Sequence, residues 1–199
     1  KSKLLITGCA GFIGYHLAKK FLKQKYMIIG IDNINNYYDI SLKKKRLSEL
    51  KLYKNFQFIK LDIRNRKKLF DNIGKVQISD IFHLAAQAGV RMSFTNPEDY
   101  FTNNLAGFFN ILEFAKYKNI KRVHLASTSS VYGNQKPPFE EKSDTDKPIS
   151  FYAATKKCDE IMAYSYFANF GISFNCLRFF TVYGTYGRPD MALFKFTKN

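Results

Sequence analysis

The sequence of 199 residues is short of cysteine, long apolar runs and acidic residues, and each shortage excludes a class of protein. Its three cysteines, Cys9, Cys158 and Cys176, are odd in number and scattered, with neither metal-ligand spacing nor a disulfide framework. We therefore expect no bound metal and a reducing, cytoplasmic compartment. No apolar run is long enough to span a bilayer, so no membrane partner is expected. No segment is an internal repeat or of low complexity.

The shortage of acidic residues leaves a formal charge of +16, from 32 basic and 16 acidic side chains. Such a charge suits nucleic acid, an anionic membrane surface or an acidic small ligand. The lysines are spread along the chain, however, and the densest run, Lys43-Lys44-Lys45-Arg46, falls in a predicted surface helix, where we expect a solvated face. No zinc finger, RNA-binding aromatic signature or basic tail accompanies the charge. We therefore expect no nucleic-acid partner.

The most informative segment present is residues 4–14, which places Gly8, Gly11 and Gly14 at three-residue spacing. An apolar run precedes the glycines and an amphipathic stretch follows, so a strand is expected to turn tightly into a helix. The free N–H groups and the dipole at such a helix start form an anion site. A second apolar run ends at Asp32, the distance at which a carboxylate accepts hydrogen bonds from an adenosine ribose. The combination favours a dinucleotide site over a ligand-free turn.

Hydrophobic periodicity alternates between strand and helix along the chain. Strands are predicted over residues 3–7, 27–31, 56–61, 80–84, 122–126 and 173–179, and helices over residues 12–24, 41–53, 66–73, 99–117 and 151–170. This order implies an α/β fold, a doubly wound, Rossmann-like parallel sheet with right-handed crossovers. Ligands on such sheets bind at the carboxyl ends of the strands. The residues expected at that edge are the glycine loop, Asp32, Asp62, His83 to Ala86 and Ser127 to Ser130.

A candidate catalytic pair lies near the end of the chain, where Tyr152 and Lys156 fall one turn apart on one helix face. An ammonium beside a phenol favours the phenolate, so a tyrosine whose ordinary pKa is about 10 becomes a usable base. The spacing alone is not decisive, because it recurs elsewhere in the chain. Tyr152 stands out because its helix follows the fifth predicted strand, whose end carries the hydroxyls of Ser127 to Ser130. A hydroxyl there can share a proton with a substrate hydroxyl.

These motifs together resemble the extended short-chain dehydrogenase/reductases. The shared motifs are Gly8-x-x-Gly11-x-x-Gly14, His83-Leu84-Ala85-Ala86, the hydroxyl run before Val131-Tyr132-Gly133, and Tyr152-x-x-x-Lys156. Further segments resemble the UDP-glucuronate 4-epimerases within that family, namely residues 32–39, 86–91, 179–184 and 187–192. The resemblance runs along essentially the whole chain.

The resemblance implies a bound NAD, with Asp32 on the adenosine ribose and Asp62 and Ile63 beside the adenine. NAD is expected in preference to NADP, since a carboxylate repels a 2′-phosphate and no arginine directly follows Asp32. The candidate cofactor-binding residues are Gly8, Gly11, Phe12, Ile13, Gly14, Asp32, Asn33, Asp62, Ile63, Leu84, Ala85, Ala86, Asn104, Tyr152, Lys156 and Phe179.

The resemblance also implies the reaction, a 4-epimerisation of UDP-glucuronate to UDP-galacturonate through a transient 4-keto sugar. Tyr152 takes the place of the base, Thr128 that of the catalytic hydroxyl, and Lys156 that of the residue that binds the nicotinamide ribose and tunes Tyr152. The candidate substrate-binding residues are Arg91, Thr128, Ser129, Ser130, Thr181 and Arg188. The full-length enzyme is expected to be a homodimer.

Two other interpretations stay open at this point. A sister enzyme is the first, either a nucleotide-sugar dehydratase or a uronate decarboxylase. A dehydratase is expected to carry an acidic pair beside the catalytic hydroxyl, whereas Thr128 is followed by Ser129 and Ser130. A decarboxylase differs mainly in how the substrate carboxylate is held. The second interpretation is a basic NAD-binding module without catalysis.

The resemblance predicts two parts of unequal length. Residues 1–178 are expected to form the NAD-binding domain with the catalytic helix. Residues 179–199 are expected to begin a substrate-binding part that is truncated, because members of the family continue well past this point. Apolar surface near Phe179, Phe180 and Phe194 is then expected to be uncovered and to favour self-association.

Overall fold

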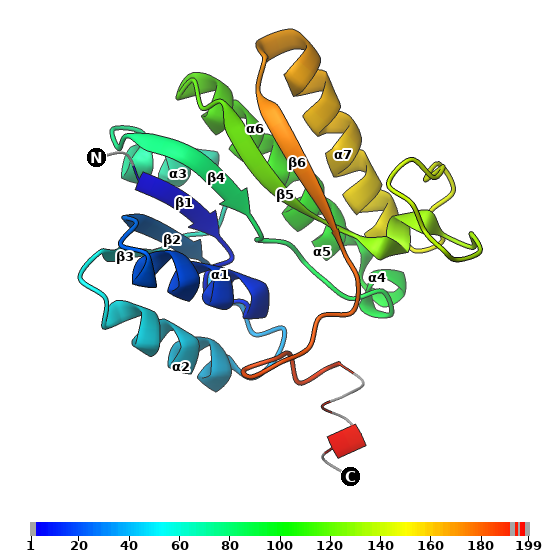
Figure 1. The fold of residues 1–199 in the computed structure, drawn as a ribbon, viewed down its shortest axis with the longest axis horizontal. Coiled ribbons are helices and arrows are strands. Elements are labelled where there is room, and N and C mark those ends of the chain that lie inside the picture. The colour runs from blue at the N-terminus through cyan, green and yellow to red at the C-terminus, as the bar shows by residue number, and fades with distance from the viewer. Residues whose placement is uncertain (1–2, 192–193, 195, 198–199) are drawn as a thin grey trace.

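The computed structural model describes residues 3–191, 194, 196 and 197, and in these residues six parallel strands form one sheet (Figure 1). The strands are β1 (Lys3–Thr7), β2 (Ile28–Asp32), β3 (Phe56–Lys60), β4 (Ile78–His83), β5 (Arg122–Thr128) and β6 (Ser173–Phe179). Their order is β3-β2-β1-β4-β5-β6. Thr7 of β1 pairs with Ile31 of β2 and with His83 of β4, so these strands end at one edge. The predicted doubly wound α/β fold is confirmed.

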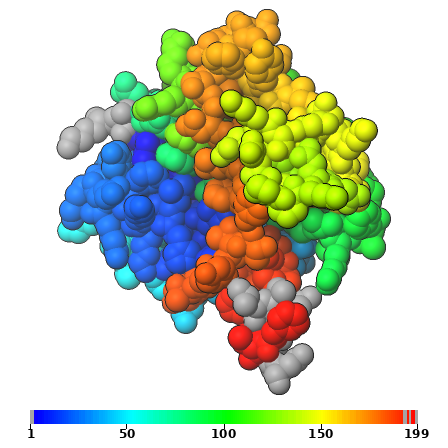
Figure 2. Space-filling view, turned by 45° about the vertical axis from the view of Figure 1, so that its right-hand side comes forward, coloured from blue at the N-terminus to red at the C-terminus, as the bar shows by residue number. Residues whose placement is uncertain are grey.

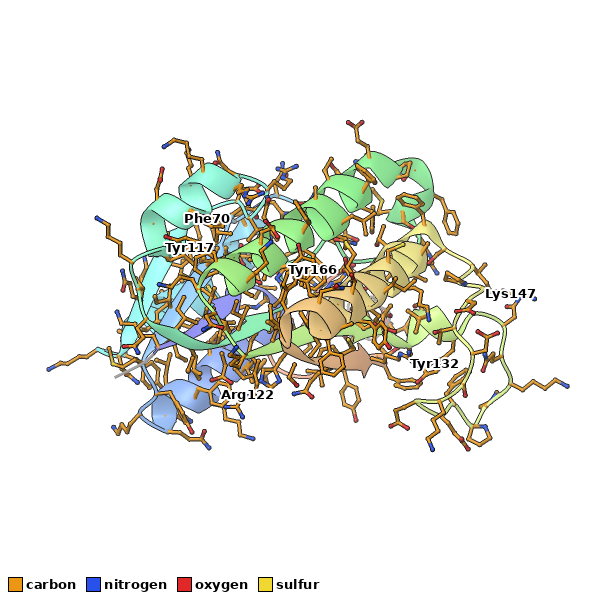
Figure 3. The ribbon with its side chains drawn as sticks, turned by 90° about the horizontal axis from the view of Figure 1, so that it is seen from above. Phe70, Tyr117, Arg122, Tyr132, Lys147 and Tyr166 are labelled. Carbon is orange, nitrogen blue, oxygen red and sulfur yellow. The ribbon has the colours of Figure 1, made fainter. Side chains whose placement is uncertain are left out.

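Helices cover the two faces of the sheet unequally. On one face lie α1 (Phe12–Lys23) and α2 (Ile40–Lys51), and on the other lie α3 (Arg66–Ile73), α6 (Gly107–Tyr117) and α7 (Phe151–Phe170). Figure 3 views the layers from above and shows α6 and α7 side by side. Tyr166 of α7 donates a hydrogen bond to Glu113 of α6 at 2.7 Å. Within the described residues, no helix combines the length and apolarity needed to cross a membrane.

Two hydrophobic cores follow from the alternation of side chains along the strands. The larger core joins Leu5 and Val123 to Leu69, Phe108 and other residues of α3, α6 and α7. The smaller core joins Leu4, Ile6 and Ile28 to residues of α1 and α2, among them Leu22 and Leu50. Alternate residues of β1 therefore fill opposite cores, which fixes the register of the central strand.

One face of the sheet is open over β5 and β6 in the part of the chain that the structure describes. Phe82 and His124 stack there with ring centroids 4.3 Å apart, and Leu177 is 39% exposed. A cavity of about 510 Å³ lies between this face and α1, lined by Phe82, Leu177, Tyr183 and others. Figure 2 shows β6 and the segment after it, in orange, at the surface between the blue N-terminal part of the chain and the yellow loop before α7.

The helix predicted over residues 99–117 is present, but it starts two residues earlier and contains a π-helical segment. The structure has α4 (Met92–Thr95), α5 (Pro97–Tyr100), a π-helical segment η1 (Phe101–Ala106) and then α6. Pro97 begins α5 because proline fits the first turn of a helix, where its missing N–H is not needed. The wider π turn cannot be read from a 3.6-residue period, and such turns are frequent at functional sites.

The solvated face predicted for the basic run is also wrong in part. Lys44 and Lys45 are exposed, but Lys43 and Arg46 are buried. Lys43 Nζ donates to the backbone carbonyl of Asn35 at 2.9 Å, and Arg46 donates to carbonyls of two distant segments. Buried cations of this kind are stable where their N–H groups find acceptors.

Candidate active site

A cavity of about 880 Å³ opens at the carboxyl ends of the strands and collects most of the predicted site residues. Of those residues, the ones that line it are Gly8, Gly11, Phe12, Ile13, Gly14, Asp32, Asn33, Ile63, Leu84, Ala85, Ala86, Arg91, Thr128, Ser129, Ser130, Tyr152, Lys156, Phe179, Thr181 and Arg188. Parallel strands bring these segments together although they span most of the chain. Asp62 and Asn104 do not line the cavity.

The glycine loop forms the tightest part of the cavity wall. Gly8 has φ +72°, and a Cβ there would lie 2.8 Å from the backbone nitrogen of Ala85. A Cβ on Gly14 would lie 2.1 Å from the carbonyl oxygen of Gly8, so the close approach of α1 to the loop requires glycine. α1 starts after Gly11, with no side chain capping its first turn and no acidic residue in it. The first N–H groups of α1 are therefore left for an anionic ligand.

Asp32 ends β2 beside this loop and is held by backbone N–H groups. Its Oδ2 accepts from Ala10 N at 3.0 Å, and its Oδ1 accepts from Ile34 N at 2.8 Å. Each carboxylate oxygen has a second lone pair for a ligand hydroxyl. Cys9, in the same loop, is buried, and burial followed by the charge of Asp32 raises the pKa of its thiol well above the ordinary value. Cys9 is thus a packed thiol and not an activated nucleophile.

Tyr152 and Thr128 also line the cavity, at the ends of elements that follow the glycine loop in the chain. The Ser150 hydroxyl accepts from Ala153 N at 3.0 Å and caps α7, which places Tyr152 in the first turn of that helix. Thr128 ends β5, and its hydroxyl accepts from Ser130 N at 3.2 Å as the chain enters the 3₁₀ turn η2 (Ser129–Tyr132). The hydroxyl hydrogen of Thr128 stays available as a donor toward the cavity.

Lys156 lies one turn beyond Tyr152 and has a partner that the sequence interpretation missed. Its Nζ donates to Asp159 Oδ2 at 2.6 Å, and both side chains are buried. Burial raises the pKa of the Asp159 carboxyl to about 6, and the adjacent Lys156 opposes that rise. An acid three residues after a lysine on one helix is the pattern that identifies this pair in the sequence.

His83 supports the wall between the two ends. The Thr7 hydroxyl accepts from the backbone N–H groups of Leu84 and Ala85 at 3.2 Å each and lies 2.8 Å from His83 Nδ1. The single hydroxyl hydrogen of Thr7 therefore points to Nδ1, which acts as acceptor in a neutral imidazole. Burial, followed by the charge of Lys156, lowers the pKa of His83 to about 3.

Two predicted arginines line the outer part of the cavity. Arg91 is exposed at the start of α4, with its side chain in solvent. Arg188 makes a two-pronged ion pair with Asp190, at 3.0 and 2.5 Å, and its guanidinium lies 5.7 Å from the ring centroid of Tyr37. Burial and the negative charge of Asp190 raise the pKa of Tyr37. This part of the cavity therefore places a guanidinium, paired with a carboxylate, beside an aromatic ring.

Comparison with known proteins now decides the family. The sequence profile described as GDP-mannose 4,6 dehydratase matches residues 5–198. The chain belongs to this family. It is 54% identical over 200 residues to an uncharacterized protein of Methanocaldococcus jannaschii and 46% identical over 194 residues to UDP-glucuronate 4-epimerase of Thermodesulfobacterium geofontis. Each match covers 98% of this chain, and 61% and 60% of the relatives.

A solved structure gives the same likeness in three dimensions. UDP-glucuronic acid 4-epimerase from Bacillus cereus, in complex with UDP-glucuronic acid and NAD, superposes with a TM-score of 0.88 and 39% identity. The match covers 96% of this chain and 60% of that one. The predicted resemblance to the extended short-chain dehydrogenase/reductases and their epimerases is confirmed, and the family member described here spans about 60% of the length of these relatives.

Two predicted cofactor residues of this family member lie outside the cavity wall. Asp62 is paired with Arg64 at 2.7 Å and accepts from Asn33. Asn104, in the π-helical segment, accepts from Gln87 N at 2.8 Å and donates to Gln87 O and to the Thr155 hydroxyl. Asn104 thereby ties the loop after β4 to α7, behind the cavity.

Other lining residues were missed by the sequence interpretation. They include Asn35, Tyr37, Tyr38, Lys43, Gln87 and Asn103. The segments 32–39 and 86–91 were noted only for their resemblance, and their spacing matches no local motif that assigns individual contacts. Asn103 lines the cavity, whereas the side chain of its neighbour Asn104 lies behind the wall.

Proposed function

We propose that the protein to which this chain belongs is an NAD-dependent nucleotide-sugar 4-epimerase that converts UDP-glucuronate to UDP-galacturonate. One observation carries the proposal. A single cavity is lined by the glycine loop and Asp32, by Tyr152 and Thr128, and by Arg91 and Arg188. The relatives named as UDP-glucuronate 4-epimerases support the choice of reaction and substrate.

The shape of the loop fits a dinucleotide. The uncapped first turn of α1 suits a pyrophosphate, and the absence of a Cβ at Gly8 and Gly14 keeps the loop thin enough for close approach. Asp32 suits the adenosine ribose, and Ile63 offers an apolar contact to the adenine. When bound, NAD would supply the hydride acceptor, and then the hydride donor, for C4 of the sugar.

Tyr152 is proposed as the base that removes the proton of the sugar 4-hydroxyl and later returns it. Thr128 donates a hydrogen bond to the same sugar oxygen, and the ammonium of Lys156 stabilises negative charge on the phenol oxygen. Lys156 also suits a ribose hydroxyl, which requires its Nζ to share or leave Asp159. The 4-keto sugar must turn over within the cavity between the two transfers, which a cavity of about 880 Å³ permits.

The carboxylate of the uronate sets a further requirement, because a 4-keto uronate is a β-keto acid and can lose CO2. Clean epimerisation needs donors that hold the carboxylate away from the alignment for that loss. We assign this role to Ser129, Ser130 and Thr181, which line the cavity beside Thr128. Arg91 and Arg188 are assigned to the diphosphate, since guanidinium groups bind such oxygens in pairs.

The decisive experiment is an activity assay on the whole protein. It is incubated with UDP-glucuronate and NAD, and the products are identified by NMR. UDP-galacturonate supports the proposal. A UDP-pentose with CO2 indicates a decarboxylase, and binding of NAD without any product indicates a non-catalytic module. A matched reaction with NADP tests the preference set by Asp32, and equal affinity for the two cofactors would contradict that assignment.

The same proposal extends to domains, assembly and compartment. Residues 1–178 form the NAD-binding domain, and residues 179–199 begin the substrate-binding part, of which 192, 193, 195, 198 and 199 lie outside the described residues. A homodimer is supported by exposed aromatic side chains on α6 and α7, among them Phe109, Tyr164 and Phe167. Light scattering on the whole protein tests the dimer. Free cysteines fit the cytoplasm.

A further inference from the structure

Arg46 of α2 has a position that the reaction outlined above does not use. Its side chain is fully buried, and it makes five hydrogen bonds. None of its partners among the described residues is a carboxylate. Nη1 donates to Ala10 O at 2.9 Å and to the Tyr38 hydroxyl at 2.6 Å. Nε and Nη2 donate to Tyr186 O at 3.1 and 2.6 Å, and Nη2 also donates to Gly187 O at 3.2 Å.

These partners belong to three segments that are far apart in the sequence. Ala10 is in the glycine loop, Tyr38 is in the segment after Asp32, and Tyr186 and Gly187 follow β6. In Figure 1 the segment after β6 runs past the ends of α1 and α2, where this contact lies. A single guanidinium therefore joins the glycine loop, the segment after Asp32 and the turn after β6, without lining the cavity itself.

The hydrogen bonds of Arg46 hold backbone that adjoins both Asp32 and Arg188. Ala10 N already donates to Asp32, so the bond from Arg46 to Ala10 O fixes the loop backbone from its other side. In the turn after β6, Arg188 directly follows the two anchored carbonyls, and its guanidinium lies over the ring of Tyr37. The Tyr186 hydroxyl donates to Glu49 of α2 at 2.7 Å, which adds a second tie for the same turn.

Only a planar fork of donors can serve this set of acceptors. Arginine offers five N–H groups in fixed directions, whereas lysine offers three on a single nitrogen. A neutral side chain of similar size leaves several buried carbonyls without a donor, which destabilises the folded chain. The turn at residues 184–187 then loses its attachment to the glycine loop.

We propose that Arg46 is a positioning residue that couples the cofactor end of the cavity to the substrate end. It places the segment carrying Arg188 against the glycine loop, so that an anionic nucleotide sugar meets Arg188 at a fixed distance from the bound dinucleotide. This role rests on the proposed function, since it assigns Arg188 to the substrate. Arg46 would then affect the affinity for the nucleotide sugar without contacting either the sugar or the dinucleotide.

The test uses the full-length enzyme with Arg46→Gln, Arg46→Lys and the control Lys44→Gln, whose lysine is exposed two positions earlier on the same helix. For Arg46→Gln we expect the KM for UDP-glucuronate to rise at least about tenfold and the Kd for NAD to rise severalfold. We expect amide hydrogen exchange in residues 184–191 to be at least about tenfold faster. Arg46→Lys should recover thermal stability in part but not the KM. Lys44→Gln should match the wild type in every measurement.

The result that overturns the proposal is a lower melting temperature with unchanged KM and unchanged exchange in residues 184–191, which is what a purely structural arginine gives. Where Arg46→Gln does not fold, Arg46→Lys carries the same comparison. The exchange measurement needs no substrate. A wild-type enzyme that fails to convert UDP-glucuronate therefore refutes the proposed function, while the exchange and NAD data still decide whether Arg46 couples the two ends.

Discussion

The two ends of the cavity differ in how completely this chain builds them. At the cofactor end, Cys9 and Ala10 are fully buried and Asp32 is nearly so, and Ala10 bonds through its N–H to Asp32 and through its carbonyl to Arg46. At the substrate end, Phe180 is 58% and Tyr183 is 74% exposed. The same contrast appears in the sheet, where β1 to β3 have helices on both faces while β5 and β6 have them on one.

The difference reflects the distance along the chain over which each end is assembled. The glycine loop, α1 and Asp32 come from one βαβ unit, so local contacts complete the cofactor end. The substrate end needs the segment after β6, which is anchored through Arg46 and through His16, 169 positions away from its partner Thr185. The relatives are longer than this chain, which spans about 60% of their length.

The largest expected effect is the loss of turnover when the hydroxyl of Tyr152 is removed. Tyr152→Phe in the full-length enzyme should lower turnover by about 10²–10⁴-fold, the usual effect of removing a positioned base. NAD affinity should not change, since the glycine loop is untouched. Steady-state kinetics and a fluorescence titration with NAD measure the two quantities. Tyr164→Phe, an exposed tyrosine on the same helix, is the matched control. Turnover near that of the wild type would remove Tyr152 from the reaction.

A second substitution breaks the cofactor end alone. The added methyl group of Gly14→Ala would lie 2.1 Å from the Gly8 carbonyl oxygen, so α1 must move away from the loop. We expect a loss of about 3 kcal/mol in the free energy of unfolding, with at least tenfold weaker NAD binding. Gly171→Ala is the control, because a Cβ there meets nothing within 4 Å and only φ +65° opposes it. It should cost about 1–2 kcal/mol and leave NAD affinity unchanged. Equal NAD affinity in both variants would contradict the close-packing argument.

Most of the fold could be predicted because it depends on local patterns. The six strands follow from apolar runs, and the observed boundaries lie within about two residues of those expected, which is the usual precision of such boundaries. The π-helical segment could not be predicted, since one extra residue in a turn leaves the periodicity of its neighbours intact. Burial of Lys43 and Arg46 could not be predicted either, because their acceptors lie in other segments.

Site residues could be predicted from the sequence where a recognisable motif assigns a role to a particular residue. The glycine loop, Asp32, Thr128 and Tyr152 all line the cavity, because strand ends meet at one edge. Asn104 lies behind the wall and Asn103 at it, and only the three-dimensional turn decides between them. The pairing of Lys156 with Asp159 was open to prediction from an acid three residues along the helix.

A substitution on the open face of the sheet tests whether further chain packs on that face. Leu177→Lys should change the free energy of unfolding of residues 1–199 by less than about 0.5 kcal/mol, since the site faces solvent. In the full-length protein it should cost about 2 kcal/mol or more if further chain packs on this face and buries the charge. Urea denaturation of both forms measures the difference. Leu52→Lys, at an 82% exposed position on the covered side, should be silent in both. Equal costs for Leu177→Lys in the two lengths would mean that the face stays open.

The smallest expected effect is a pH dependence of stability, which should arise from His83 behind the cavity wall and not from His124 on the open face of the sheet. Burial lowers the pKa of His83 to about 3, whereas an unfolded histidine titrates near pH 6.5. Below about pH 6.5 the unfolded chain therefore binds one more proton than the native chain at this site. Stability should fall by about 1.4 kcal/mol per pH unit as the pH drops from about 6.5 toward 3.

His83→Gln should remove this dependence, because the amide oxygen of glutamine can accept the Thr7 hydroxyl hydrogen without titrating in this range. His124, half-buried on the open face, has its pKa lowered by burial but keeps contact with solvent. His124→Gln should therefore change the slope much less. Urea unfolding at about pH 7 and pH 5.5 measures both slopes. If His83→Gln keeps the wild-type slope, the loss of stability in acid arises from carboxylates elsewhere, and the wall between the two ends is not its source.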